Sequence, residues 1–434
     1  MEDENQGLSA QLDWNIGDHT LTSITAYRTW ENTQIQDGDR LSAVIPSVQV
    51  QSHDRGDVDF NQISQELRLA SPKGNFVEYV AGLYYLTTDD DQTYRRDIIT
   101  VAGVPHTGVA DFSVETTSYS AFGETTFNFT DRFRSLMGLR WTNDDIDFTH
   151  ARVSTSTASQ AGIRPAESGS GSTSEDEVSG RVGVEFDLTD DVLTYFTYSQ
   201  GYKGPAYNVF FNAAAVNGDY LPLAQETSDS FELGLKSTLF DNRLRFNAAV
   251  FDTTYDNYQA NFRDVVGGTV VTRLINAGEV SSKGVEVDFE AKITPQFTLS
   301  GAIAKIDARI DEFKIPSGLT PAQIAAANVN GKPLPFSPDV KGSLQANYAI
   351  ELGNGLIIDL GTDYNWQSEV QYDLSQTPDT IQDSYGIWNA SIALSDPDKG
   401  WRVALLGKNL ADESYASFLQ QANGGLCLLY TSPS

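Results

Sequence analysis

Hydrophobic and polar residues alternate with a period of two along most of this chain. From Val285 to Ile293 every odd position is apolar and every even position is charged. The same alternation recurs at 181–188, 244–250, 340–350 and 356–367. Because successive side chains of a β-strand point to opposite faces, each segment predicts a strand with one apolar and one polar face.

Two kinds of connection alternate between the expected strands. Residues suited to sharp reversals form the tight turns, at Gly17-Asp18, Pro72-Lys73-Gly74, Thr130-Asp131, Thr189-Asp190-Asp191, Asp241-Asn242, Thr294-Pro295-Gln296, Gly353-Asn354-Gly355 and Asp396-Pro397-Asp398. Long polar stretches at 36–56, 90–110, 150–175, 203–225, 263–278, 313–336 and 374–382 separate them. These turns imply about sixteen strands. Tight turns on one rim and long loops on the other are typical of outer-membrane barrels.

Composition is compatible with that fold. Among the 434 residues no run approaches the length of an apolar transmembrane helix, and the mean hydropathy is −0.31. A transmembrane barrel also has low hydropathy, because only every second residue faces lipid. The net charge of −30 argues against nucleic acid as a partner, and the 40% hydrophobic content argues against disorder.

Aromatic residues gather near the expected strand ends, where they would form girdles at the membrane interfaces. They are Tyr27, Trp30, Tyr84, Tyr85, Trp141, Tyr195, Tyr198, Tyr364, Trp366, Trp388 and Trp401. Aromatic residues also favour strands in general, so the girdle is an interpretation that the fold must support.

No catalytic pattern stands out, and we expect no enzyme, no cofactor and no metal site. The four histidines are far apart in the sequence, without the close spacing of zinc ligands. The run Asp89-Asp90-Asp91 could bind calcium, but no second set of oxygen ligands accompanies it, and acidic runs are usually solvated. A segment at Thr320–Ala327, with Pro321 at the first helical position, predicts a short helix in one loop.

Five strings in a characteristic order resemble the barrel of TonB-dependent outer-membrane receptors. They are Gln62–Ser71, Tyr195–Gly204, Asn276–Glu279 with Lys283–Glu286, Leu334–Pro338 and Gly407–Tyr415. The resemblance extends from about residue 6 to residue 420 and implies an all-β, antiparallel, up-and-down transmembrane barrel. It further implies that about 16 of 22 strands are present, without the N-terminal plug, the TonB box or a signal peptide. We expect residues 1–425 to be this incomplete barrel and residues 426–434, which include Cys427, to be a non-native read-through tail.

The resemblance also implies a function and partners. Such receptors lie in the outer membrane of Gram-negative cells, contact its lipid and lipopolysaccharide, and take up a scarce nutrient such as an iron–siderophore complex. The TonB complex would act only through the missing plug, and we expect a monomer. The polar strand face would line the lumen, with Glu66, Arg68, Glu232, Lys236, Arg245, Glu286, Asp288, Glu290, Asp359, Asp363, Arg402 and Lys408.

Ligand-binding residues are expected on the long loops and the upper lumen, where polar and aromatic side chains meet the exterior. The candidates are Arg40, Arg55, Tyr94, Arg95, Arg96, His106, Tyr207, Phe210, Tyr220, Arg263 and Arg273. An anionic ferric siderophore would need such arginines, whereas the negative net charge favours a neutral or cationic ligand. Two other functions stay open: a passive, substrate-specific porin, and a soluble or surface β-adhesin. A solenoid would show a fixed repeat, and the loop lengths vary instead.

Overall fold

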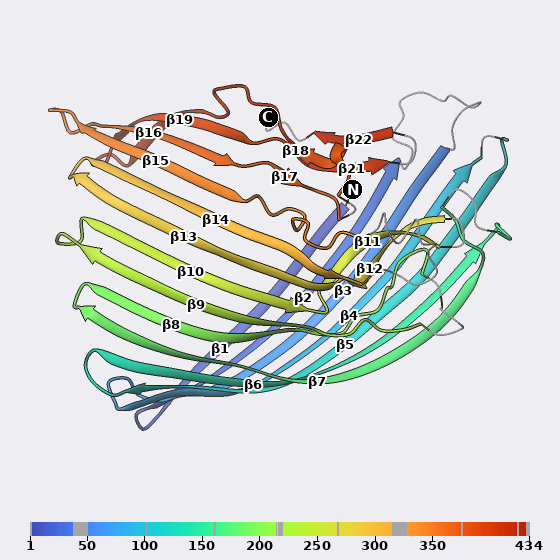
Figure 1. Ribbon diagram of the computed structural model, residues 1–434, viewed down its shortest axis with the longest axis horizontal. Coiled ribbons are helices and arrows are strands. Elements are labelled where there is room, and N and C mark those ends of the chain that lie inside the picture. The colour runs from blue at the N-terminus through green and yellow to red at the C-terminus, as the bar shows by residue number, and fades with distance from the viewer. Residues whose placement is uncertain are drawn as a thin grey trace.

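The computed structural model describes residues 2–37, 51–100, 102–158, 162–213, 215, 220–266, 269–314, 328–374, 376–422 and 425–430, with the backbone alone for 262–273 and 420–430. Sixteen strands form one antiparallel sheet in the order β1 to β10, β13 to β16, β19 and β20 (Figure 1). Each strand pairs with its neighbour along the chain in this order, which is the up-and-down arrangement that the alternating connections predict. The strand number is confirmed.

The strands of the sheet differ in length. Their bounds are β1 (Glu2–Ile16), β2 (His19–Asp37), β3 (Gln51–Ala70), β4 (Val77–Ile99), β5 (Pro105–Asn128), β6 (Phe133–Ser154), β7 (Glu167–Thr189), β8 (Val192–Lys203), β9 (Glu226–Leu239), β10 (Leu244–Asp256), β13 (Gly278–Thr294), β14 (Phe297–Phe313), β15 (Val340–Glu351), β16 (Ile357–Gln367), β19 (Tyr385–Asp396) and β20 (Trp401–Gly407). Three small hairpins stand apart from the sheet: β11 (Gln259–Val266) with β12 (Thr269–Asn276), β17 (Val370–Gln371) with β18 (Ile381–Gln382), and β21 (Ala416–Ala422) with β22 (Gly425–Tyr430). A 3-10 turn, η1 (Pro378–Thr380), precedes β18. Within the described residues, no helix has the length and hydropathy needed to cross a membrane.

All eight predicted tight turns connect paired strands at one rim, and the longer connections lie at the other. Several predicted loops are shorter than expected. The stretch 90–110 is almost entirely strand, because β4 and β5 stay in register up to the pair Ile99 and Pro105. Likewise the strand β3 begins at Gln51, β7 begins at Glu167, and 263–278 contains most of the hairpin β11–β12. The predicted helix at Thr320–Ala327 lies outside the described residues.

These long hairpins escaped prediction because the signal of alternation disappears above the membrane. There the outward face meets water instead of lipid, so it carries polar residues such as Thr93, Arg95 and Asp97, and the sequence looks like a loop. The backbone pairing nevertheless continues, since each strand still satisfies its neighbour's N–H and C=O groups.

The register separates one apolar face from one polar face across the whole sheet. A continuous row on the apolar face runs Trp14, Leu21, Leu69, Ala81. The side chains on this face are exposed rather than packed together: Leu8 is 75% and Leu83 is 59% accessible. In the described part of the chain, the buried apolar clusters gather instead at the rim of long connections, around Phe211, Phe313 and Leu419. The apolar rows therefore do not form the dry centre of a sandwich, which excludes that form of the soluble alternative.

Eleven of the twelve predicted lumen residues share the polar face, and the twelfth, Lys408, follows the end of β20. Glu286 lies opposite Ala249 on β10, and Glu232 and Lys236 are on the same face of β9. Ion pairs join some of them, such as Arg68 with Glu66 at 3.3 Å. The girdle prediction was only partly right: Tyr27, Tyr85 and Trp141 lie on the apolar face, but Trp30, Tyr84 and Tyr195 face the lumen.

Glycines let aromatic rings lie flat against the sheet. Tyr195 on β8 covers Gly234, its partner on β9, while its hydroxyl donates a hydrogen bond of 2.5 Å to Glu232. A Cβ at Gly234 would collide with the Tyr195 ring. We expect Gly234→Ala to displace this ring and destabilise the barrel by about 1–3 kcal/mol, the usual effect of overpacking. Thermal melting followed by gel mobility would measure this change, with Gly342→Ala, where the nearest atom is 3.4 Å away, as the control. An unchanged melting temperature would contradict the close packing.

Candidate ligand-binding site

The described residues of the connection between β8 and β9, which are 204–213, 215 and 220–225, fold against the polar face of β4, β5 and β6. Phe211 packs on Tyr94, with ring centroids 5.2 Å apart, and its neighbours Ile98, Ala110 and Phe112 are buried beneath it. Gly108 on β5 faces the same ring, so that a Cβ there would meet Phe211. The connection therefore covers the upper lumenal wall instead of extending into solvent.

The buried side chain of Arg152 holds the β8–β9 connection, termed the cover, against the strands. Its side chain is 0% exposed, and its guanidinium donates hydrogen bonds to the carbonyls of Phe211 (3.0 Å), Ala213 (2.9 Å) and Pro165 (2.9 Å). It also pairs with the Glu167 carboxylate at 3.2 Å. Since Pro165 and Glu167 follow β6 and lead into β7, one buried cation joins two connections to the sheet.

A second ring cluster lies beside Arg152. The ring centroid of Phe148 lies 4.5 Å from that of Tyr207 and 5.2 Å from that of Tyr220. Both tyrosines belong to the β8–β9 connection. His150 stacks on Phe112 and is also near Tyr220, and neither of its ring nitrogens has a hydrogen-bond partner in the described structure. His150 lies nine residues beyond the girdle residue Trp141, roughly 30 Å along the strand, so it is outside the membrane.

The environment of His150 keeps its ring neutral. Burial, and then the positive charge of Arg152, lower the pKa of His150 from its ordinary value. The pKa of His150 is lower in the folded protein than in the unfolded chain. The docked cover therefore has its full stability at pH values above the pKa of the unfolded state, and it loses stability as the pH falls through the pKa of the folded state. We expect acidification from neutral pH to about pH 5 to expose the β8–β9 connection to limited proteolysis. His150→Phe, which keeps the stacking and removes the titration, should abolish this response; a response unchanged in that variant would contradict the assignment.

The structure brings four of the predicted residues together at this site: Tyr94, Arg96, Tyr207 and Tyr220. Arg96 donates hydrogen bonds of 2.7 and 2.6 Å to Asp54, and its guanidinium also lies 5.5 Å from the Phe211 ring. Burial raises the pKa of Tyr94 to about 12, which keeps the phenol neutral. Tyr94 and Arg96 lie on β4 and hold the cover in place. The sequence predicts a loop at both positions instead.

Among the other predicted residues, Phe210 also lies in the cover, whereas Arg55, Arg95 and His106 lie elsewhere. Arg55 and Arg95 are cross-strand partners on β3 and β4, but they share the apolar side of the sheet, and each pairs with a carboxylate two residues away. His106, at the start of β5, bonds Ser156 at 3.0 Å. Phe210 lies in the cover, where its carbonyl accepts the Ala213 N–H. Arg40 is outside the described residues, and Arg263 and Arg273 are placed only by their backbone on β11 and β12.

The residues that the sequence did not single out are Phe112, Phe148, His150, Arg152 and Phe211. Phe148, between Asp147 and Thr149, still follows the alternation, whereas the polar side chains of His150 and Arg152 stand beside the apolar Ala151. Their stretch was assigned to a loop from residue 150 onward, and the alternation was not followed across that boundary.

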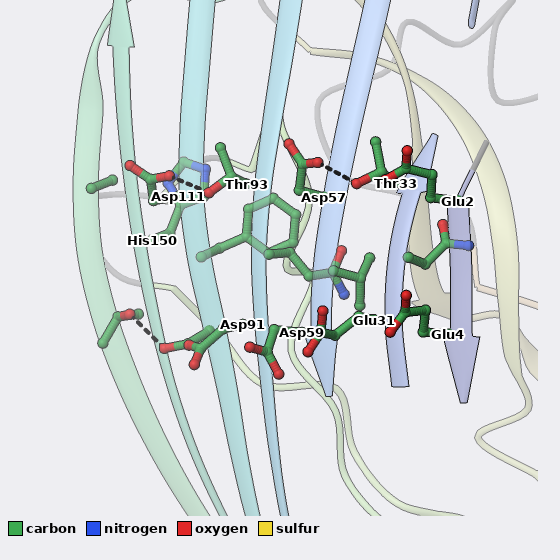
Figure 2. Close-up of a pocket in the computed structure, with 17 residues that line it drawn as sticks. Glu2, Glu4, Glu31, Thr33, Asp57, Asp59, Asp91, Thr93, Asp111 and His150 are labelled. Carbon is green, nitrogen blue, oxygen red and sulfur yellow. Dashed lines mark hydrogen bonds between the residues drawn. The ribbon is translucent and has the colours of Figure 1, made fainter. Parts of the chain in front are cut away.

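A further hollow, of about 600 Å³, lies on the outward side of the same strands and is lined by carboxylates (Figure 2). Asp91, Asp59, Glu31 and Glu4 form a cross-strand row there. This row shares its face with Leu83 and Leu67, so it is not lumenal. The calcium hypothesis for Asp89-Asp90-Asp91 gains no support, because Asp90 points to the opposite face from its neighbours and the described residues contain no group of metal-binding side chains.

Comparison with known proteins agrees with this architecture. A family model described as TonB dependent receptor-like, beta-barrel matches residues 1–410. The pesticin receptor of Yersinia enterocolitica is 27% identical over 370 residues, which is 80% of this chain and 51% of that protein. The chain thus spans about half the length of the curated relatives that it matches.

Solved structures show the same fold at lower identity. The ferric yersiniabactin uptake receptor FyuA from Yersinia pestis superposes with a TM-score of 0.77 at 22% identity, over 98% of this chain and 58% of that one. The siderophore receptor PiuA from Acinetobacter baumannii gives a TM-score of 0.70 at 19% identity, over 95% and 61%. Together with the sixteen-stranded sheet and the family model matched over residues 1–410, these likenesses establish that the chain belongs to the TonB-dependent receptor family and forms part of its β-barrel.

Proposed function

We propose that this chain forms the barrel wall of an outer-membrane receptor that takes up a scarce nutrient, such as an iron–siderophore complex, with energy from the TonB complex. The observation that carries the proposal is the sheet with an exposed apolar face and a polar lumenal face, combined with the family membership. Relatives named as receptors for pesticin, ferric yersiniabactin and ferric pyoverdine support a ferric siderophore as the ligand class. The family consists of receptors, so the chain is not an enzyme.

Within this proposal, the ligand would meet the upper lumenal wall at the β8–β9 connection. Tyr207, Phe210 and Tyr220 lie on that connection, and Tyr94 and Arg96 lie beneath it. Because Asp54 already neutralises Arg96, we do not assign this arginine to direct pairing with an anionic ligand. Aromatic contact through the cover is the mode of binding that the geometry favours.

We place the receptor in the Gram-negative outer membrane as a monomer, with its apolar face in contact with lipid. The carboxylates on the outward side of β1–β4 lie above that apolar band (Figure 2). They support contact with the polar zone of the outer leaflet, including lipopolysaccharide.

Uptake of radioactive iron tests the function. The complete gene would be expressed in a Gram-negative strain that lacks its own siderophore receptors, and cells would be given ferric yersiniabactin, ferric pyoverdine or ferric citrate. We expect accumulation of iron from at least one complex in tonB⁺ cells and none in a tonB deletion. Uptake that is unaffected by the deletion would instead support the passive porin, and no uptake of any complex would contradict a siderophore receptor.

A further inference from the structure

Asp90 differs from the other two aspartates of its run in the face that it occupies. Asp89 and Asp91 point outward, whereas the Asp90 side chain points into the lumen. Its cross-strand partners are Phe60 on β3 and Val114 on β5. One carboxylate thus lies in a lumenal row that is otherwise aromatic or apolar on β2 to β6, and this row comprises Trp30, Phe60, Asp90, Val114 and Phe148.

This row leads to the ligand-binding cover. The ring centroids of Phe148 and Tyr207 lie 4.5 Å apart, and Tyr207 belongs to the cover. Asp90 is two strand spacings from Phe148, roughly 10 Å. The carboxylate is therefore on the same wall as the cover and beside it, at a distance that one ligand can span.

The charge of Asp90 lacks a compensating cation. Both carboxylate oxygens accept hydrogen bonds from the Gln92 amide, at 3.0 and 2.9 Å, and within the described part of the chain no basic side chain pairs with them. Asp90 lies five residues beyond the girdle residue Tyr85, roughly 17 Å along the strand, so it is outside the membrane. Burial raises the pKa of Asp90 above its ordinary value, more than the hydrogen bond from Gln92 lowers it. A half-buried carboxylate in this state is stabilised when a cation approaches it.

Other lumenal carboxylates of this wall already have basic partners. Asp54 accepts hydrogen bonds from Arg96, and Glu167 pairs with the buried Arg152. Arg28 also faces the lumen, but it lies one row toward the tight turns and two strands away, and it does not pair with Asp90. Asp54 and Glu167 therefore serve the cover, whereas Asp90 is available to a charge from outside the chain.

We propose that Asp90 binds a positively charged group of the ligand, an ammonium or a guanidinium, at the lumenal wall beside the cover. The carboxylate supplies charge-assisted hydrogen bonds to such a group, and the adjacent Phe60 ring attracts a cation to its face. A carboxylate of the ligand at the same place is repelled. This inference rests on the proposed receptor function and deepens it, because it names the charge that the ligand carries where it meets the wall.

Iron complexes that share one scaffold and differ in charge test the site. Ferrioxamine B is a trihydroxamate complex with a free ammonium group; its N-acetyl derivative is neutral at that end, and its N-succinyl derivative carries a carboxylate there. Binding to the receptor from the complete gene, purified in detergent, would be measured by quenching of tryptophan fluorescence. We expect the ammonium complex to bind about tenfold more tightly than the acetyl complex, the factor that corresponds to about 1.4 kcal/mol. The succinyl complex should bind most weakly.

Substitutions at two adjacent positions assign the effect to one face. Asp90→Asn should remove the discrimination, so that the ammonium and acetyl complexes bind alike, and Asp90→Glu should retain it. The matched control is Asp91→Asn, which removes the same charge from the next residue on the outward face and should behave as wild type. Heat-modifiable gel mobility confirms that each variant is folded.

The outcomes distinguish this inference from the receptor function. A preference for the ammonium complex that persists in Asp90→Asn, or that is lost equally in Asp91→Asn, would overturn the role of Asp90. Equal affinity for all the complexes, a preference for the succinyl complex, or no binding of the ammonium complex would overturn a cationic ligand. The receptor function stands in each of these cases if cells accumulate iron from any complex only when tonB is present, and it falls if they do not.

Discussion

Replacing Arg152 by Met is expected to release the β8–β9 connection from the lumenal wall. The substitution removes hydrogen bonds to the carbonyls of Phe211, Ala213 and Pro165 and leaves the Glu167 carboxylate without its buried partner. Breaking a buried ion pair from one side costs about 3–5 kcal/mol when the remaining charge is fully desolvated; Glu167 is 27% exposed and keeps Arg164 at 3.8 Å, so we expect the lower end of that range. The substitution should therefore reduce the free energy of docking of the β8–β9 connection and leave the sheet intact, since the strand pairing of β6 does not depend on this side chain.

Hydrogen exchange would measure the release at two amides of the connection. The Ala213 N–H bonds the Phe210 carbonyl and the Leu223 N–H bonds the Ala206 carbonyl, so both are protected while the cover is ordered. Both should exchange at least a hundredfold faster in Arg152→Met, the factor that corresponds to about 3 kcal/mol. The control is Arg95→Met, which removes an exposed ion pair with Asp97 and should change little. Equal exchange in the two variants would mean that Arg152 does not fasten the cover.

The second large effect concerns two consecutive alanines on β10. Ala248 lies between Leu235 and Val287 in the apolar row, whereas Ala249 lies between Gly234 and Glu286 on the polar face. An arginine on the lipid side near the middle of the bilayer destabilises a barrel by about 2–4 kcal/mol. At position 249 the same arginine would meet water and the Glu286 carboxylate, so we expect almost no loss.

Urea titration of the complete protein folded in lipid vesicles would compare Ala248→Arg with Ala249→Arg. The two variants have the same composition, charge and position along the strand, and they differ only in the face that receives the arginine. A large loss of folding free energy for Ala248→Arg alone would confirm that the face of Ala248 meets lipid. A larger loss for Ala249→Arg would reverse the two faces and remove the basis of the membrane assignment.

The sequence predicted the fold more fully than the site, for a physical reason that particular residues make clear. Within the bilayer one face of each strand must be apolar. The alternation in a segment such as Val285–Ile293 therefore predicts both that it is a strand and which of its side chains face the lipid. Above the bilayer this constraint ends, and strand residues such as Arg95 and Arg96 cannot be distinguished from a loop by polarity. Their opposite roles follow only from register, which places Arg96 under the cover and Arg95 outside.

The contacts of the site were equally hidden in the sequence. Phe211 and Tyr94 are separated by more than a hundred residues, and nothing in either segment indicates the other. The tight turns, in contrast, depend on two or three adjacent residues, and all eight that join neighbouring strands of the sixteen-stranded sheet were predicted. Local signals were therefore predictable, whereas the pairing of a connection with a distant wall required the structure.

The strand pairing that continues beyond the membrane has a consequence for how this surface can evolve. On β4 and β5 beyond Thr87, backbone pairing holds the two strands together, and side chains on the outward face need not be apolar, whereas the inward face packs against the cover. Exposed residues on that outward face can be substituted without altering the strand pairing beneath them. Sequence variation on this surface should therefore accumulate as substitutions along the paired strands, and not only as insertions in the loops that join them.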